Sequence, residues 1–130
     1  MAVADVRSYS GLGTRRIQIV SLPSVHPGSA VLEDIVRRLV GAYRPRRVYL
    51  FGSVARGDWG PDSDYDVLVV VPDDADPARR RSRLGYEALR GTGYAADILV
   101  WRESEFDVRL SLKASLPSTV LREGRLLYAA

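Results

Sequence analysis

The segment from Phe51 to Val71, FGSVARGDWGPDSDYDVLVVV, constrains the fold more than any other part of the chain. A short apolar run ends at Phe51, a Gly-Ser turn and a polar loop follow, and two aspartates then open a second apolar run. Because side chains alternate between the faces of a strand, Asp64 and Asp66 are expected to project from one face and Tyr65 from the other. The chain must therefore place two carboxylates side by side at the start of a buried strand.

Two like charges on one face repel each other unless a cation lies between them. Carboxylate oxygens suit magnesium, which proteins usually hold with one or two carboxylates together with substrate phosphates. The turn at Gly52 and Ser53 offers backbone N–H groups and a hydroxyl, which are donors for an anion. An anion-binding turn beside an acidic metal site predicts an enzyme that uses a nucleoside triphosphate.

A third carboxylate, Asp97, stands at the head of a later apolar run, ILVW. A transfer reaction that uses two metal ions needs ligands shared between cations about 3.5–4 Å apart, and a further carboxylate can fix the second cation. The same carboxylate can help to remove the proton of an attacking hydroxyl. An aspartate on a neighbouring strand is able to do both, whereas Asp97 alone would be an ordinary carboxylate at the end of a strand.

Segments with a helical period alternate with short apolar segments, which predicts a single α/β domain. The apolar period after Ser29 predicts a helix that is ended by Gly41 and Pro45. The run 66–71 is apolar on both faces and is therefore expected at the centre of the sheet. The other expected elements are strands at 47–51, 94–101 and, at an edge, 126–128, and helices at 78–90, 103–116 and 117–122.

Residues 1–28 are expected to form an N-terminal arm ahead of a domain over residues 29–130. Met1–Gly13 is rich in small and polar residues and is expected to be poorly ordered. Arg16–Leu22 predicts either one short edge strand or an extended arm.

With 130 residues, of which 46% are hydrophobic, the chain can bury one ordinary core. No apolar run approaches the roughly 20 residues needed to span a bilayer, and the N-terminus lacks the apolar stretch of a signal peptide. The absence of cysteine excludes disulfides and thiolate metal sites, and a single histidine, His26, cannot form a histidine-rich site. These features predict a cytoplasmic protein with no membrane association.

The net charge of +3 is small, and nearly all basic residues are arginines. The run Arg79, Arg80, Arg81 and Arg83 is interpreted as a solvated helix face, with contact to phosphate or RNA as the alternative. Nucleic acid is therefore a less favoured partner. Arg56, close to the Gly-Ser turn, is placed either to contact a triphosphate or to pair with an acidic neighbour.

The motif GSVARG at 52–57, followed by SDYD at 63–66, resembles the signature of the DNA polymerase beta-like nucleotidyltransferase superfamily. The small size makes the chain similar to the minimal nucleotidyltransferases, which are commonly encoded beside an HEPN-type partner protein. The likeness runs from the predicted helix near Val31 to the C-terminal segment LREGRLLY. The resemblance implies the nucleotidyltransferase fold, a small mixed β-sheet flanked by helices.

The resemblance also implies roles for the candidate residues. Gly52 and Ser53 would hold the β- and γ-phosphates of the nucleotide, with Arg56 as a further nucleotide contact. A hydroxyl would attack the α-phosphorus of a nucleoside triphosphate, with ATP as the expected substrate, and pyrophosphate would leave.

The same resemblance implies two magnesium ions. Asp64 and Asp66 would ligate both ions, and Asp97 would complete the catalytic metal site and assist deprotonation of the acceptor. A phosphatase of the haloacid dehalogenase type also uses an Asp-x-Asp site, but it needs a threonine two residues after the second aspartate. Leu68 occupies that position, which argues against such an enzyme.

In the HEPN-paired relatives the acceptor is the partner toxin, often at a tyrosine hydroxyl, and adenylylation silences its RNase activity. The resemblance therefore implies an antitoxin with an HEPN-family partner. The alternative is a catalytically idle module that neutralises the partner by binding it. A protein tyrosine, an RNA 3′ end and a small-molecule hydroxyl all stay open as acceptors. Because so little chain lies outside the core, the protein is expected to work in a complex, and LLYAA at the C-terminus could serve a homo-oligomer.

Overall fold

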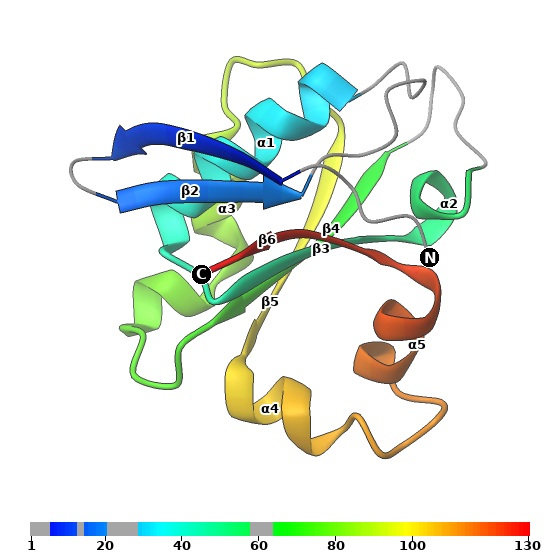
Figure 1. The fold of residues 1–130 in the computed structure, drawn as a ribbon. Helices are drawn as coiled ribbons and strands as arrows, with labels where there is room; N and C mark the ends of the chain where they lie inside the picture. The colour runs from blue at the N-terminus through cyan, green and yellow to red at the C-terminus, as the bar shows by residue number, and fades with distance from the viewer. Residues whose placement is uncertain (1–5, 13–14, 21–28, 58–63) are drawn as a thin grey trace.

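The computed structural model describes residues 6–12, 15–20, 29–57 and 64–130, with side chains from residue 30 onward except at Ser53. In this part of the chain the strands form one six-stranded sheet in the order β1-β2-β6-β3-β4-β5 (Figure 1). All pairs are antiparallel except β4 and β5, which are parallel. The elements are β1 (Val6–Leu12), β2 (Arg15–Val20), α1 (Ser29–Tyr43), β3 (Arg47–Phe51), α2 (Gly52–Ala55), β4 (Tyr65–Val71), η1 (Pro77–Arg80), α3 (Ser82–Ala88), β5 (Ala96–Arg102), α4 (Glu103–Val108), α5 (Leu116–Glu123) and β6 (Arg125–Ala129).

Helices cover both faces of the sheet (Figure 1). One face packs against α1 and α3, and the other packs against α4 and α5. Strand β4 lies between β3 and β5 and contributes Val67, Val69 and Val71 to the first core and Leu68 and Val70 to the second. The prediction that this run is buried on both faces is therefore confirmed, although β4 is an interior strand next to the edge strand β5 and does not lie at the centre of the sheet. The predicted α/β fold with a mixed sheet flanked by helices is also confirmed.

Helix α1 carries the periodic apolar stripe that the sequence predicts. Its inward residues Leu32, Ile35, Val36, Leu39 and Tyr43 are all buried. The prediction that Gly41 ends the helix is wrong, because the helix continues to Tyr43. The chain then leaves the helix at Arg44, which takes the left-handed conformation (φ 47°) more usual for glycine.

The predicted helix at 78–90 is interrupted. Arg81 has an extended backbone and separates η1 from α3. Two arginines of the predicted solvated face have structural roles instead: the Nε atoms of Arg79 and Arg80 donate to the carbonyl oxygens of Tyr43 and Ala75, at 3.0 and 2.8 Å. Arg83 is exposed and pairs with Glu87 one helical turn later, as expected of a solvated face.

The predicted single helix at 103–116 is also wrong. Helix α4 ends at Val108, turns follow, and α5 begins at Leu116 with Ser115 as its N-cap. The apolar period of this segment is ragged because Val108 and Leu112 do not face the core: they are 72% and 60% exposed. The last predicted helix agrees with α5, and the predicted strand at 47–51 has the bounds of β3.

The N-terminal region and the last strand both differ from the prediction, and the two differences are linked by one strand pairing. Strands β1 and β2 form an antiparallel hairpin, where the sequence predicts an arm with at most one edge strand. Because β2 pairs with β6 at Ile19 and Tyr128, β6 lies inside the sheet and not at its edge. Within the described ranges, no helix is both long and apolar enough to cross a membrane.

Tyr43 links the end of α1 to the start of α3. Its side chain is fully buried, and its hydroxyl donates to the carbonyl of Arg81 and accepts from the N–H of Gly85 at 2.7 Å. Burial raises the pKa of Tyr43 to about 12, so the hydroxyl keeps its proton and stays a donor over the neutral range.

We expect Tyr43→Phe to lower the free energy of unfolding by about 1–3 kcal/mol, because the buried N–H of Gly85 and the partly buried carbonyl of Arg81 lose their partner. Urea denaturation measures this loss. Leu112→Ala, at an exposed position, is the control and should change the free energy by less than about 0.5 kcal/mol. Equal stability of Tyr43→Phe and the wild type would show that the hydroxyl does not hold α3.

Candidate active site

The backbone at Gly52 lies against the carboxylate of Asp66. Phe51 of β3 pairs with Asp66 of β4, and α2 begins at Gly52, directly after Phe51. Gly52 has a φ of +75°, and a Cβ added there would lie 2.1 Å from Oδ2 of Asp66. Only glycine fits this turn, because any side chain would fill the space beside the carboxylate.

Asp66 and Asp97 are direct neighbours across β4 and β5. The two strands are parallel and in register, with Asp66 opposite Asp97. Leu68 lies two residues after Asp66, and Trp101 lies four residues after Asp97, so each shares a face of the sheet with its aspartate. Because Leu68 and Trp101 pack in the core under α4 and α5, both carboxylates belong to that face. Tyr65 is buried in the core on the opposite face, as the alternation predicts. Asp64 is exposed and directly precedes β4.

The predicted carboxylates interact electrostatically. The pKa of the Asp66 carboxyl is raised, first by partial burial and then by repulsion from Asp97 and Asp64, while Arg56 acts in the opposite direction. The structure therefore brings Asp64, Asp66, Asp97 and Arg56 into one electrostatic neighbourhood. A cation among these oxygens would relieve the repulsion, so the donor set fits a hard divalent metal ion.

In the described part of the chain, no three acidic or histidine side chains converge closely enough to form a complete metal site. Magnesium sites often use only one or two carboxylates and take their other ligands from substrate phosphates and water. The arrangement fits an ion that arrives with a nucleotide better than a permanent structural ion.

The other predicted residues lie around Gly52. The backbone of Ser53 is in the first turn of α2, and its side chain lies outside the described part of the structure. Arg56 follows α2 and is exposed. The loop residues Asp58, Trp59 and Asp62 lie outside the described residues.

Tyr86 is a neighbour of Asp97 that the sequence did not reveal. Its hydroxyl donates to Oδ1 of Asp97 at 3.0 Å and accepts from the N–H of Ile98 at 3.2 Å. Tyr86 lies on α3, and no spacing rule connects a helical tyrosine to a strand aspartate eleven residues later. The one sequence signal is the glycine before it, Gly85, inside a helical pattern.

Comparison with known proteins decides the family. The profile of the nucleotidyltransferase domain family matches residues 30–127. The chain belongs to the nucleotidyltransferase domain family.

A curated relative agrees with this nucleotidyltransferase assignment. A protein of Methanocaldococcus jannaschii that carries the provisional name protein adenylyltransferase is 34% identical over 99 residues. The match covers 75% of this chain and 94% of the relative. The resemblance seen in GSVARG and SDYD is thereby confirmed, and the chain is a nucleotidyltransferase enzyme.

Two solved structures share the fold of this nucleotidyltransferase. A toxin–antitoxin structure with AMP-PNP aligns with a TM-score of 0.51 at 22% identity. A mutant of the MntA–HpeT toxin–antitoxin aligns with a TM-score of 0.50 at 20% identity. Each alignment covers 75% of this chain and 73% of the other chain. At these identities the likeness establishes the fold.

We expect Asp66→Asn to raise the free energy of unfolding at pH 7 in the absence of divalent metal, because it removes a charge that is partly buried and repelled by Asp97 and Asp64. The pKa of Asp66 is higher in the folded than in the unfolded state. The wild type therefore loses stability as the pH rises through that pKa and regains it on acidification. The difference between the two proteins should disappear at a pH below the ordinary range of an aspartate. Chemical denaturation over this pH range measures it, and an Asp66→Asn protein less stable than the wild type at pH 7 would contradict the account.

Proposed function

We propose that the chain is a magnesium-dependent adenylyltransferase that transfers AMP from ATP to a hydroxyl of a protein. We further propose that this protein is a cognate HEPN-family toxin and that the modification makes the chain an antitoxin. The observation that supports the chemistry is the side-by-side arrangement of Gly52, which starts α2 directly after β3, Asp66 on β4 and Asp97 on β5.

This arrangement can bind the triphosphate of the nucleotide. The first backbone N–H groups of a helix have no partner within the helix, so the start of α2 at Gly52 and Ser53 can donate to the β- and γ-phosphates. Arg56 adds a positive charge at the other end of this short helix. The absence of a side chain at Gly52 lets the phosphates approach Asp66.

The carboxylates can bind the metal ions and accept the proton that the transfer reaction requires. Asp64, Asp66 and Asp97 would hold Mg²⁺ together with phosphate oxygens, and the bound ions would neutralise charge on the triphosphate. Asp97, which lies one strand beyond Asp66 as seen from Gly52, would accept the proton of the incoming hydroxyl. The hydroxyl oxygen forms a bond to the α-phosphorus, the bond from that phosphorus to the β-phosphate oxygen breaks, and pyrophosphate leaves.

The relatives and the family match support a protein as the acceptor. The Methanocaldococcus jannaschii relative is named for transfer to protein, and the two solved structures of the same fold are toxin–antitoxin proteins. The family match covers residues 30–127 and so nearly coincides with the domain expected at residues 29–130. We therefore propose that residues 29–130 are the catalytic domain and that the acceptor protein docks on it as a partner.

Label transfer from α-³²P-ATP tests the proposal. We expect magnesium-dependent labelling of a co-expressed HEPN-family protein, with no labelling from γ-³²P-ATP. Asp97→Asn should lower the transfer rate by about 10²–10⁴-fold, the usual contribution of a positioned acid–base group, while ATP still binds. Asp107→Asn, which alters a surface carboxylate beside Arg47, is the control and should transfer at the wild-type rate.

Each of the other outcomes supports a different function for this chain. Neutralisation of the HEPN protein without any label would favour the idle binding module. Label on an RNA 3′ end or on a small molecule would keep the nucleotidyltransferase chemistry and exclude the protein acceptor. Labelling from γ-³²P-ATP would show that the enzyme transfers the terminal phosphoryl group and not AMP.

A further inference from the structure

We propose that Tyr86 is a positioning residue that holds Asp97 in place for metal binding and for the transfer step. The inference rests on the proposed function, because that function gives Asp97 its role. It adds a residue from outside the sheet to the acidic site.

Strand β5 gives Asp97 little support of its own. In the sheet as described, β5 pairs with β4 on one side and is the last strand on the other. Asp97 is exposed and stands second in this edge strand, where backbone pairing is weakest. A carboxylate in such a place needs a further contact to keep one orientation.

Tyr86 supplies that contact on the open side of β5. Its hydroxyl accepts from the N–H of Ile98, as the carbonyl of another strand would, and donates to Oδ1 of Asp97. One oxygen atom thereby fixes both the backbone of the edge strand and the adjacent carboxylate. The contact leaves Oδ2 of Asp97 for a metal ion or for the acceptor proton.

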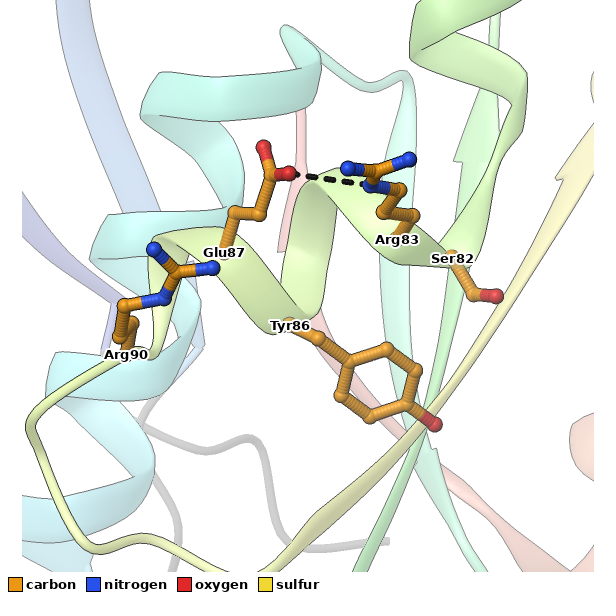
Figure 2. A pocket seen from close by; sticks show the side chains of 5 residues that line it. All are labelled: Ser82, Arg83, Tyr86, Glu87 and Arg90. Atoms are coloured by element: carbon orange, nitrogen blue, oxygen red, sulfur yellow. Dashed lines mark hydrogen bonds and ion pairs between the residues drawn. The ribbon is translucent and has the colours of Figure 1, made fainter.

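The hydroxyl, and not the ring, determines where the side chain lies. Tyr86 is 44% exposed and forms part of the wall of a shallow surface pocket of about 450 Å³. Figure 2 shows the ring projecting from α3 away from the Arg83–Glu87 ion pair and toward the strand. A ring with so much exposed surface gains little from packing, so its two hydrogen bonds are the main restraint.

Helix α3 is itself held at the distance that these bonds require. Gly85 is buried against β5, and a Cβ there would lie 2.8 Å from Cδ1 of Ile98 and 3.0 Å from the Tyr43 hydroxyl. The N–H of Gly85 donates to that same hydroxyl. Tyr43 and Gly85 therefore set the approach of the helix to the strand, and Tyr86 uses that approach to reach Asp97.

Tyr86→Phe tests the proposal because it keeps the ring and removes only the hydroxyl. We expect the affinity for Mn²⁺, measured by calorimetry in the presence of α,β-methylene-ATP, to fall by about tenfold or more, which is typical for the loss of a residue that orients a metal ligand. In the transfer assay kcat should fall while KM for ATP stays the same. Amide hydrogen exchange at Ile98 should become faster, because that N–H loses its acceptor.

Tyr94→Phe is the matched control. The hydroxyl of Tyr94 also donates to a carboxylate, Oδ2 of Asp34 at 2.8 Å, but Asp34 lies on α1 outside the acidic site. This variant should bind Mn²⁺ and transfer AMP as the wild type does, so a general effect of removing a tyrosine hydroxyl is accounted for.

Three results would overturn the proposal. They are unchanged Mn²⁺ affinity in Tyr86→Phe, unchanged exchange at Ile98, or AMP attached to Tyr86 itself, which would make it an acceptor. Failure of the wild type to bind Mn²⁺ with the nucleotide analogue is a separate result, which would refute the proposed function as well.

Discussion

The parallel pairing of β4 with β5 is the constraint on which the site depends. The other pairs of the sheet are antiparallel, and only a parallel pair brings the beginnings of two strands to the same edge. The in-register pairing sets Asp66 opposite Asp97. Parallel strands need a long connection, and here η1 and α3 provide it. The connection also brings Tyr86 to the open edge beside Asp97.

The site is held together by the core and not by its own charges. Partial burial of Asp66 and its repulsion by Asp97 and Asp64 oppose this arrangement. It is tolerated because β4 is buried on both faces directly after Asp66, between the core under α1 and the core under α4 and α5. A metal–nucleotide complex would remove this repulsion, so binding and the relief of an unfavourable arrangement act together. Under the proposed function, this coupling would offset the cost of keeping several carboxylates together in a small domain.

The central strands and the acidic face were predictable because their signals are local. The apolar run 66–71 predicts a strand buried on both faces, and strand alternation alone places Asp66 and Tyr65 on opposite faces. The features that the sequence did not predict involve contacts between segments far apart in the chain. Strand β2 pairs with β6 from the far end of the chain, and the break at Arg81 lies where Arg79 and Arg81 contact Tyr43 of α1. The contact of Tyr86 joins a helix to an edge strand. Local periodicity carries no information on such contacts.

A crystal structure with Mg²⁺ and α,β-methylene-ATP would test the central claim most directly. The account predicts a metal ion in contact with the carboxylates of Asp66 and Asp97, with the terminal phosphates over Gly52 at the start of α2. It also predicts that the α-phosphate lies between the two aspartates. A nucleotide bound elsewhere on the fold, or bound here with Asp97 remote from both metal and phosphate, would contradict the account.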